Sequence, residues 1–105
     1  MTQIEIYVVK TEIIGNKAAN VLLESLKEEI TSKLGGITEL RTKRGAWIEN
    51  DKVFEDKVEI WRFCVDNSKS VDFQWLKQQI RYIKAVTSQR SQLWTCNPQI
   101  GVYFE

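Results

Sequence analysis

A run of cations beside a tryptophan is the part of this sequence most suited to binding chemistry. The residues of this basic hairpin are Arg41, Lys43, Arg44 and Trp47 in RTKRGAW, with Arg62 on the following strand. Cations bind phosphates and an indole stacks on bases, so the cluster could hold a nucleic-acid backbone. Yet KVEIWRFCVD lacks the glycine-aromatic order of an RNA-recognition strand, and Glu55, Asp56 and Glu59 could pair with the cations across the hairpin. A solvated, salt-bridged hairpin with a bulge at Gly45 is the preferred interpretation, and nucleic acid is not the favoured partner.

Histidine is absent from the sequence, and its absence excludes several kinds of active site. A Ser-His-Asp or Cys-His arrangement cannot form, and neither can a histidine-ligated zinc or haem site. The phosphate-binding patterns G-x-x-x-x-G-K-[ST] and G-x-G-x-x-G are also missing. Catalysis would therefore have to use carboxylates, Lys, Arg, Tyr or Cys, and we expect no cofactor and no metal.

The two cysteines, Cys64 and Cys96, belong to no C-x-x-C pair. Buried, reduced thiols are the preferred interpretation, because free cysteine is among the most buried residue types. A disulfide between them stays open as an alternative, although a cytoplasmic protein would not normally keep one. Cys96 lies beside a polar loop and is the better candidate for a reactive thiol.

Length and charge indicate an ordinary globular protein. The 105 residues predict a single domain spanning 1–105. With 15 Lys and Arg against 14 Asp and Glu, the net charge of +1 provides no overall field that would attract nucleic acid or an anionic membrane. The opening MTQIEIYVVK contains Glu5, so we expect neither a signal peptide nor a membrane span, and a cytoplasmic location.

Periodicity predicts six elements in the order β-α-β-β-α-β. Alternation marks a strand over Gln3–Glu12, and Asn16 and Gly35 are placed to begin and end a helix over Lys17–Leu34. Its apolar stripe is expected to consist of Val21, Leu22, Leu26, Ile30 and Leu34. Two β-rich runs, Ile37–Ile48 and Val53–Asp66, flank the polar ENDK and predict a long hairpin.

The remaining two elements complete a ferredoxin-like pattern. Asp72 is placed to cap a helix from Phe73 to about Ser88, with Phe73, Leu76, Ile80 and Ile83 on its apolar face. A last strand, Leu93–Phe104, is interrupted by Asn97-Pro98. We therefore predict an α+β, ferredoxin-like β-α-β-β-α-β sandwich, an antiparallel sheet with two helices on one face, which could pair into a dimeric α/β barrel.

Both faces of the predicted sheet carry large apolar residues. The face covered by the helices is expected to comprise Ile4, Ile6, Val8, Ile100, Val102 and Phe104. The opposite face would comprise Tyr7, Val9, Gly101 and Tyr103. On the third strand, Trp61 and Phe63 alternate with Ile60 and Cys64, so either set could face outward. An open apolar face usually marks an interface or a pocket. We assign a ligand or partner surface to Tyr7, Trp61, Phe63 and Tyr103, with a second copy in a homodimer, or another protein, as the expected partner.

The central third of the chain and its last strand resemble a known group. The run GGITELRTKRGAWIENDKVFEDKVEIWRF, followed by a helix and IGVYFE, resembles an uncharacterised bacterial family of small ferredoxin-like proteins with a GG-[LI]-T…G-x-W element. The matching positions are Gly35, Gly36, Ile37, Thr38, Gly45, Trp47 and Glu55. The resemblance implies the fold and a dimer or ligand pocket, but no activity. In topology the chain also resembles the dimeric α/β-barrel monooxygenases, although the missing histidine argues against a haem-degrading member.

Three classes of function follow from these observations. We prefer a small non-enzymatic binding or regulatory protein that acts through the apolar sheet face, because the sequence offers no catalytic set. The alternative is a cofactor-independent enzyme of the dimeric α/β-barrel type. In such an enzyme, Tyr7, Trp61 or Tyr103 would form the walls of the pocket, and Glu59 or Arg62 would transfer protons or stabilise charge. The third class is a nucleic-acid-binding module that uses the basic hairpin, recognisable by salt-dependent affinity.

Overall fold

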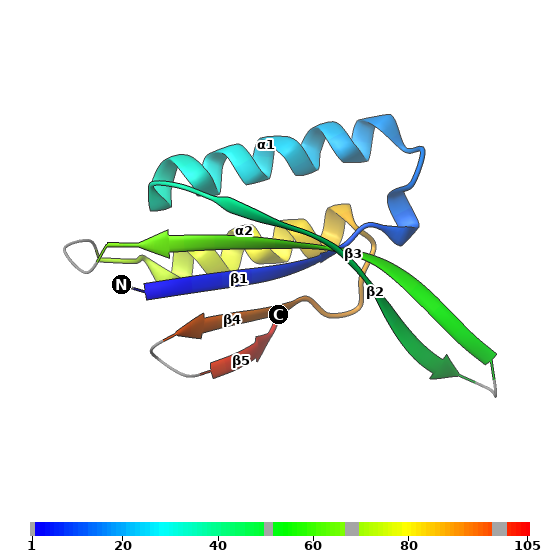
Figure 1. Ribbon diagram of the computed structural model, residues 1–105. Coiled ribbons are helices and arrows are strands. Elements are labelled where there is room, and N and C mark those ends of the chain that lie inside the picture. The colour runs from blue at the N-terminus through cyan, green and yellow to red at the C-terminus, as the bar shows by residue number, and fades with distance from the viewer. Residues whose placement is uncertain (1, 50–51, 67–69, 98–100) are drawn as a thin grey trace.

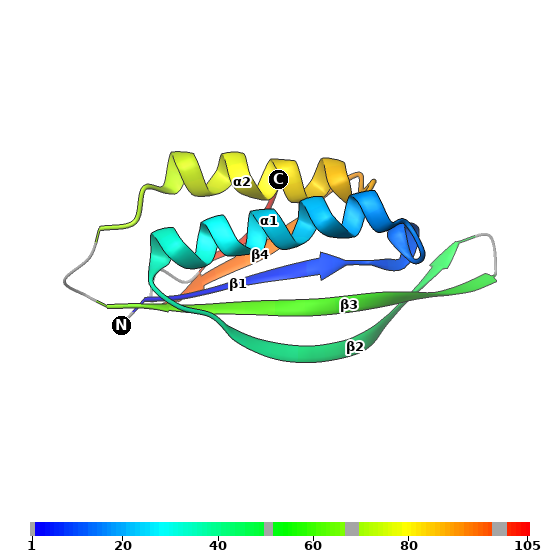
Figure 2. The ribbon, with the colours of Figure 1, turned by 90° about the horizontal axis from the view of Figure 1, so that it is seen from above.

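Two helices lie side by side on one face of an antiparallel sheet (Figure 1), and no described helix covers the other face, here called the bare face (Figure 2). The computed structural model describes residues 2–49, 52–66, 70–97 and 101–105, with side chains described except at 38–49, 52–56 and 101. The elements are β1 (Thr2–Val9), η1 (Thr11–Ile13), α1 (Lys17–Leu34), β2 (Thr38–Glu49), β3 (Lys52–Val65), α2 (Phe73–Val86), β4 (Leu93–Asn97) and β5 (Gly101–Phe104).

The strands are ordered β2-β3-β1-β4-β5, and each neighbouring pair is antiparallel. This order confirms the predicted ferredoxin-like α+β fold. The predicted last strand is instead two strands, because β4 ends at Asn97 and β5 returns along it as a hairpin. Pro98, where the sequence predicted the interruption, lies outside the described residues.

Both predicted ends of α1 are confirmed. The Asn16 side chain accepts a hydrogen bond of 3.1 Å from the backbone N–H of Ala19, which satisfies a donor in the first turn. Gly35 ends the helix with φ of 97°, a left-handed conformation that glycine adopts without a steric cost. Its N–H donates to the Thr31 carbonyl at 2.8 Å.

The buried stripe of α1 differs from the prediction. Leu23, Ile30 and Leu34 are buried, whereas Val21 and Leu22 are 59% and 56% exposed. The predicted stripe ran backward from Leu34 in steps of four residues, and each such step drifts by about 40° around a helix. A step of three residues back from Leu26 returns to the helix face that meets the sheet, and it leads to Leu23.

Helix α2 begins where predicted and ends two residues early. The Asp72 side chain accepts a hydrogen bond of 3.1 Å from the Trp75 N–H. The last residue is Val86 rather than Ser88, which has a left-handed φ of 55°. The predicted apolar residues Leu76, Ile80 and Ile83 are buried.

The core lies between the helices and the rows of strand residues that face them. The buried strand residues are Ile4, Ile6, Val8, Trp61, Phe63, Val65, Trp94 and Cys96. Partners across an antiparallel pair share a face, so Ile6 opposite Trp61 and Ile4 opposite Phe63 point to the helices together. The predicted partner surface is therefore wrong for Trp61 and Phe63, which have no exposed area.

Strand β5 faces opposite to the prediction. Because it forms a hairpin with β4, Tyr103 lies opposite Trp94, and their rings stack with centroids 4.5 Å apart. Tyr103 thus packs against the core, while Val102 and Phe104 are each 66% exposed on the bare face. The bulge expected at Gly45 is also wrong, since Gly45 pairs regularly with Asp56 and the register shifts between Leu40 and Lys43.

Adjacent leucines of α1 provide a test of this packing. Leu23→Ala should lower the free energy of unfolding by about 2–5 kcal/mol, the usual cost of truncating a buried leucine. Leu22→Ala, one residue away on the exposed side, should cost less than about 0.5 kcal/mol. Urea unfolding at one protein concentration gives both values, and equal losses would contradict the assigned face of the helix.

Candidate functional site

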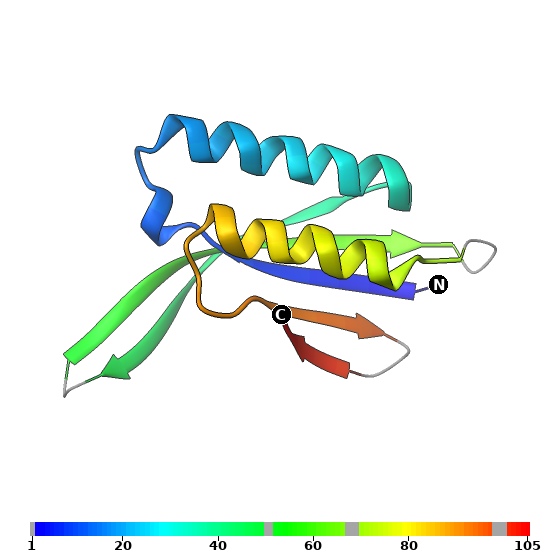
Figure 3. The same cartoon turned by 180° about the vertical axis from the view of Figure 1, so that it is seen from behind.

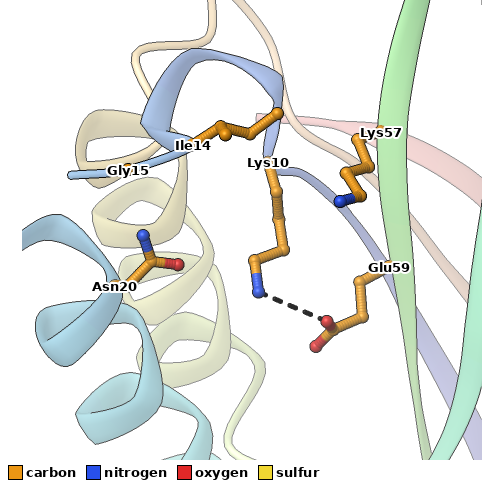
Figure 4. Close-up of a pocket in the computed structure, with 6 residues that line it drawn as sticks. All are labelled: Lys10, Ile14, Gly15, Asn20, Lys57 and Glu59. Carbon is orange, nitrogen blue, oxygen red and sulfur yellow. Dashed lines mark hydrogen bonds and ion pairs between the residues drawn. The ribbon is translucent and has the colours of Figure 1, made fainter. Parts of the chain in front are cut away.

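A pocket of 320 Å³ lies at the end of β1, between the start of α1 and strand β3 (Figure 4). The residues that line it are Lys10, Ile14, Gly15, Asn20, Lys57 and Glu59. This volume is at the lower end of the range for small-molecule sites, ~300–1,000 Å³. Three charged side chains and one amide converge on it, which gives it the chemistry to orient a polar ligand.

Backbone hydrogen bonds hold the wall of the pocket to the sheet. The Lys10 N–H donates to the Lys57 carbonyl at 2.7 Å, and the Lys57 N–H donates to the Thr11 hydroxyl at 2.7 Å. Gly15 then turns the chain into α1 with φ of 79°, a conformation that favours glycine. The Asn20 amide donates back to the Ile13 carbonyl at 2.9 Å. The connection from β1 to α1 is thereby fixed against β3.

Glu59 is the charged centre of the site. It lies on the helix side of β3, opposite Val8 and beyond the buried row that contains Trp61. The Trp61 indole N–H donates to Oε1 at 2.6 Å, and the Lys10 ammonium lies 3.4 Å from Oε2. Lys27 of α1 brings a second ammonium to 3.8 Å from Oε1 and 5.5 Å from the centroid of the Trp61 ring.

Opposing effects set the pKa of Glu59. Burial is the largest single effect and would raise the pKa, because it disfavours the charged carboxylate. The Trp61 hydrogen bond and the charges of Lys10 and Lys27 together outweigh burial, so the pKa lies below its ordinary value of 4.5. The carboxylate is therefore ionised at neutral pH. With 20% of its side chain exposed, it can still meet a ligand.

The residues proposed for the enzymatic alternative do not all lie together. Glu59 lines the pocket, and Trp61 holds it from the core side. Arg62 points to the other face of the sheet and forms an ion pair of 3.2 Å with Glu5. Tyr7 lies on that bare face too, and Tyr103 belongs to the stack with Trp94. Of the two residues predicted to transfer protons or stabilise charge, Glu59 and Arg62, only Glu59 lines the pocket.

The basic hairpin is only partly within the described residues. Arg41, Lys43, Arg44 and Trp47 lie on β2, and their side chains are outside the described set. The backbone register places Arg44 opposite Lys57, while the carboxylate-bearing Asp56 and Glu55 lie opposite Gly45 and Ala46. Glu59, expected to pair with these cations, instead bonds to Lys10 and Lys27. The nucleic-acid hypothesis stays a prediction.

The prediction of two reduced thiols is confirmed, but the burial predicted for Cys64 and the reactivity predicted for Cys96 are wrong. Both are free, so no disulfide links them. Cys96, the expected reactive thiol, is buried at 2% exposure, and burial raises its pKa, which disfavours the nucleophilic thiolate. Cys64 is the exposed one.

Sequence reasoning missed most of the pocket, including Lys10, Asn20 and Lys57, and it missed the contact of Lys27 with Glu59. A signal was present, because the predicted fold pairs β1 with β3 antiparallel and so brings the residues after β1 to the early part of β3. Lys10 and the turn at Gly15 would then meet Lys57 and Glu59.

Within the described residues, no three His, Cys, Asp or Glu side chains form a metal-binding group, and neither helix is long and apolar enough to cross a membrane.

Substituting Glu59 should produce a stability difference that depends on pH. A carboxyl with a lowered folded-state pKa adds stability above its unfolded value and loses it as pH falls through the folded value. The excess stability of wild type over Glu59→Gln should therefore be steady near neutrality and shrink below pH 4.5. Urea unfolding over a pH series measures it. A stability difference that does not change with pH would contradict the charged network. The control is Glu28→Gln, an exposed site on α1, which should lower the free energy of unfolding by less than about 0.5 kcal/mol.

Comparison with known proteins shows the fold and overturns one prediction. No family model matches the chain, and no curated protein does, so the resemblance to the GG-[LI]-T group stays a prediction. A phage SAM lyase in complex with S-methyl-5′-thioadenosine matches with a TM-score of 0.67 at 15% identity, over 99% of this chain and 88% of that one. A phage SAM lyase in the apo state matches with a TM-score of 0.62 at 12% identity, over 99% and 87%. These structures of similar fold are enzymes, which contradicts the preferred prediction of a non-enzymatic binding protein and favours the enzymatic alternative.

Proposed function

We propose that this protein is an enzyme that cleaves S-adenosylmethionine (SAM) and releases S-methyl-5′-thioadenosine. The observation that carries the proposal is the likeness to the phage SAM lyase, which covers 99% of this chain. Since a fold hosts many activities, the proposal also needs a suitable site. The pocket around Glu59 supplies one.

The pocket offers a carboxylate and ammonium groups, the two kinds of charge that SAM would contact. The substrate carries a sulfonium, an ammonium and a carboxylate, so it needs both an anion and a cation from the protein. The ionised Glu59 can accept hydrogen bonds from the ammonium, and Lys57 presents its ammonium from the same wall for the carboxylate (Figure 4). Asn20 on α1 adds an amide at the rim.

The cleavage does not require a nucleophile from the protein. The bond between sulfur and the aminobutyrate carbon breaks, and its electron pair neutralises the sulfonium. A carboxylate oxygen of the same substrate can form the new bond to that carbon, which closes a five-membered lactone without adding or removing a proton. The protein then needs only to bind the folded-back substrate, because proximity supplies much of the rate. This route is consistent with a chain that has no histidine.

A second copy of the chain remains our proposed partner. The helices cover one face of the sheet, and the opposite face keeps exposed apolar side chains such as Val102 and Phe104. Faces of this kind usually meet another protein surface.

A direct assay tests the proposed activity. Purified protein incubated with SAM should form S-methyl-5′-thioadenosine, measured by chromatography, faster than SAM decays without protein. Glu59→Gln should lower the rate roughly ten- to hundredfold, because a hydrogen bond to a charged group contributes about 1.5–3 kcal/mol.

The exposed variant Glu28→Gln serves as the matched control and should retain the wild-type rate. Circular dichroism must show that Glu59→Gln is folded at the assay temperature. Formation of S-methyl-5′-thioadenosine no faster than in the blank would overturn the activity. Equal rates for wild type and Glu59→Gln would instead place the active site elsewhere.

A further inference from the structure

The sheet face opposite the helices, here called the open face, is mostly apolar in its described side chains. Its described members are Gln3, Glu5, Tyr7, Val9, Val58, Ile60, Arg62, Cys64, Leu93, Thr95, Asn97, Val102 and Phe104. Glu5 and Arg62 are the charged pair among them, and they neutralise each other at 3.2 Å. Val102 and Phe104 are each 66% exposed, so the described part of the chain leaves the β5 edge uncovered.

The distal part of the β2–β3 hairpin, here called the arm, projects beyond the rest of the sheet. Strand β1 pairs with β3 only as far as Val58, which lies opposite Val9. Beyond that point residues 44–49 of β2 pair with residues 52–57 of β3, and no other described strand joins them. Figure 1 shows the arm extending away from both helices, and Figure 3 shows it from behind.

The composition of the arm does not suit isolation in water. Trp47 pairs with Phe54, and Ile48 pairs with Val53, so the two pairs next to the last one of the ladder consist of large apolar residues. An isolated two-stranded hairpin is at best marginally stable in water, and further strands or a packing layer are needed to stabilise it. The described part of this chain provides no third strand for the arm.

We propose that the arm of one copy packs against the open face of a second copy of the same chain. Within the described residues of each copy, nothing packs on the large apolar residues of the arm and nothing covers the open face, so two copies placed arm to face supply each other with a packing surface. Among the described side chains of the open face, the acid Glu5 and the base Arg62 pair with each other, so neither leaves an unpaired charge for an acidic or basic occupant. The arm has no net charge either, since its cations Arg44, Lys52 and Lys57 are balanced by Glu49, Glu55 and Asp56. The proposal stands whether or not SAM is the substrate.

The apolar groove between the helices is a weaker candidate for this contact. It is lined by Leu22, Leu26, Glu29 and Tyr82, among others, so it carries a negative charge at its rim. The arm has no net positive charge that would complement this negative rim. The groove therefore supplies the control surface for the experiment.

Light scattering across a concentration series measures the mass of the particle. The wild type should exceed the 12.3 kDa of one chain, and Val102→Asp and Phe104→Asp should each reduce the mass to that value. These side chains are exposed, so circular dichroism should show that the monomeric variants keep the fold. Leu22→Asp, at 56% exposure on the helix surface, is the matched control and should leave the assembly intact.

A second variant tests the arm itself. Replacing residues 46–55 by an Asn-Gly turn closes the hairpin after the pair Gly45–Asp56 and should also give a folded monomer. A wild type that stays at 12.3 kDa at every concentration overturns the proposal. So does an assembly that survives either the face substitutions or the shortened arm. These readouts contain no SAM, so they are independent of the activity assay.

Discussion

The register of β1 against β3 is the constraint on which the rest of this structure depends. It sets Ile6 opposite Trp61 and Val8 opposite Glu59, so one row of β3 changes from a buried indole to a carboxylate within two residues. A slip of one residue would turn Trp61 to the open face and move the carboxylate away from Lys10 and Lys27. The same pairing therefore fixes both the core and the charged pocket at its edge.

The position of Glu59 explains why a carboxylate is stable there. Burial disfavours its charge, but the indole N–H of Trp61 donates directly to it and two ammonium groups lie within 4 Å. Each partner belongs to a different part of the fold: Lys10 follows β1, Lys27 is on α1, and Trp61 is on β3 itself. The pocket is thus assembled by tertiary structure, and its electrostatics depend on α1 lying correctly over the sheet.

The sequence was sufficient for the order of the first three strands and the two long helices, and for the ends of α1, because caps such as Asn16 and Gly35 are local signals. It was insufficient wherever a face had to be chosen. Leu22 and Leu23 are chemically identical, and the angle at which the helix meets the sheet selects between them. Likewise, the facing of β5 follows from its antiparallel pairing with β4, which sets Tyr103 opposite Trp94 on the helix side. The pocket was missed for a similar reason, since Lys10 and Lys57 meet only through strand pairing.

Lys57 joins the two regions for which functions are proposed. Its backbone bonds to Lys10 and Thr11 hold it at the last point where β3 is supported by the body of the fold. Its neighbours toward the turn belong to the arm, where β3 pairs with β2 and no other described strand. Glu59 lies two residues from Lys57 along β3, in the direction away from the turn. Any contact that orders the arm therefore acts on the same strand, within two residues of the charged centre of the pocket, so the assembly of the protein and the geometry of its site share one structural element.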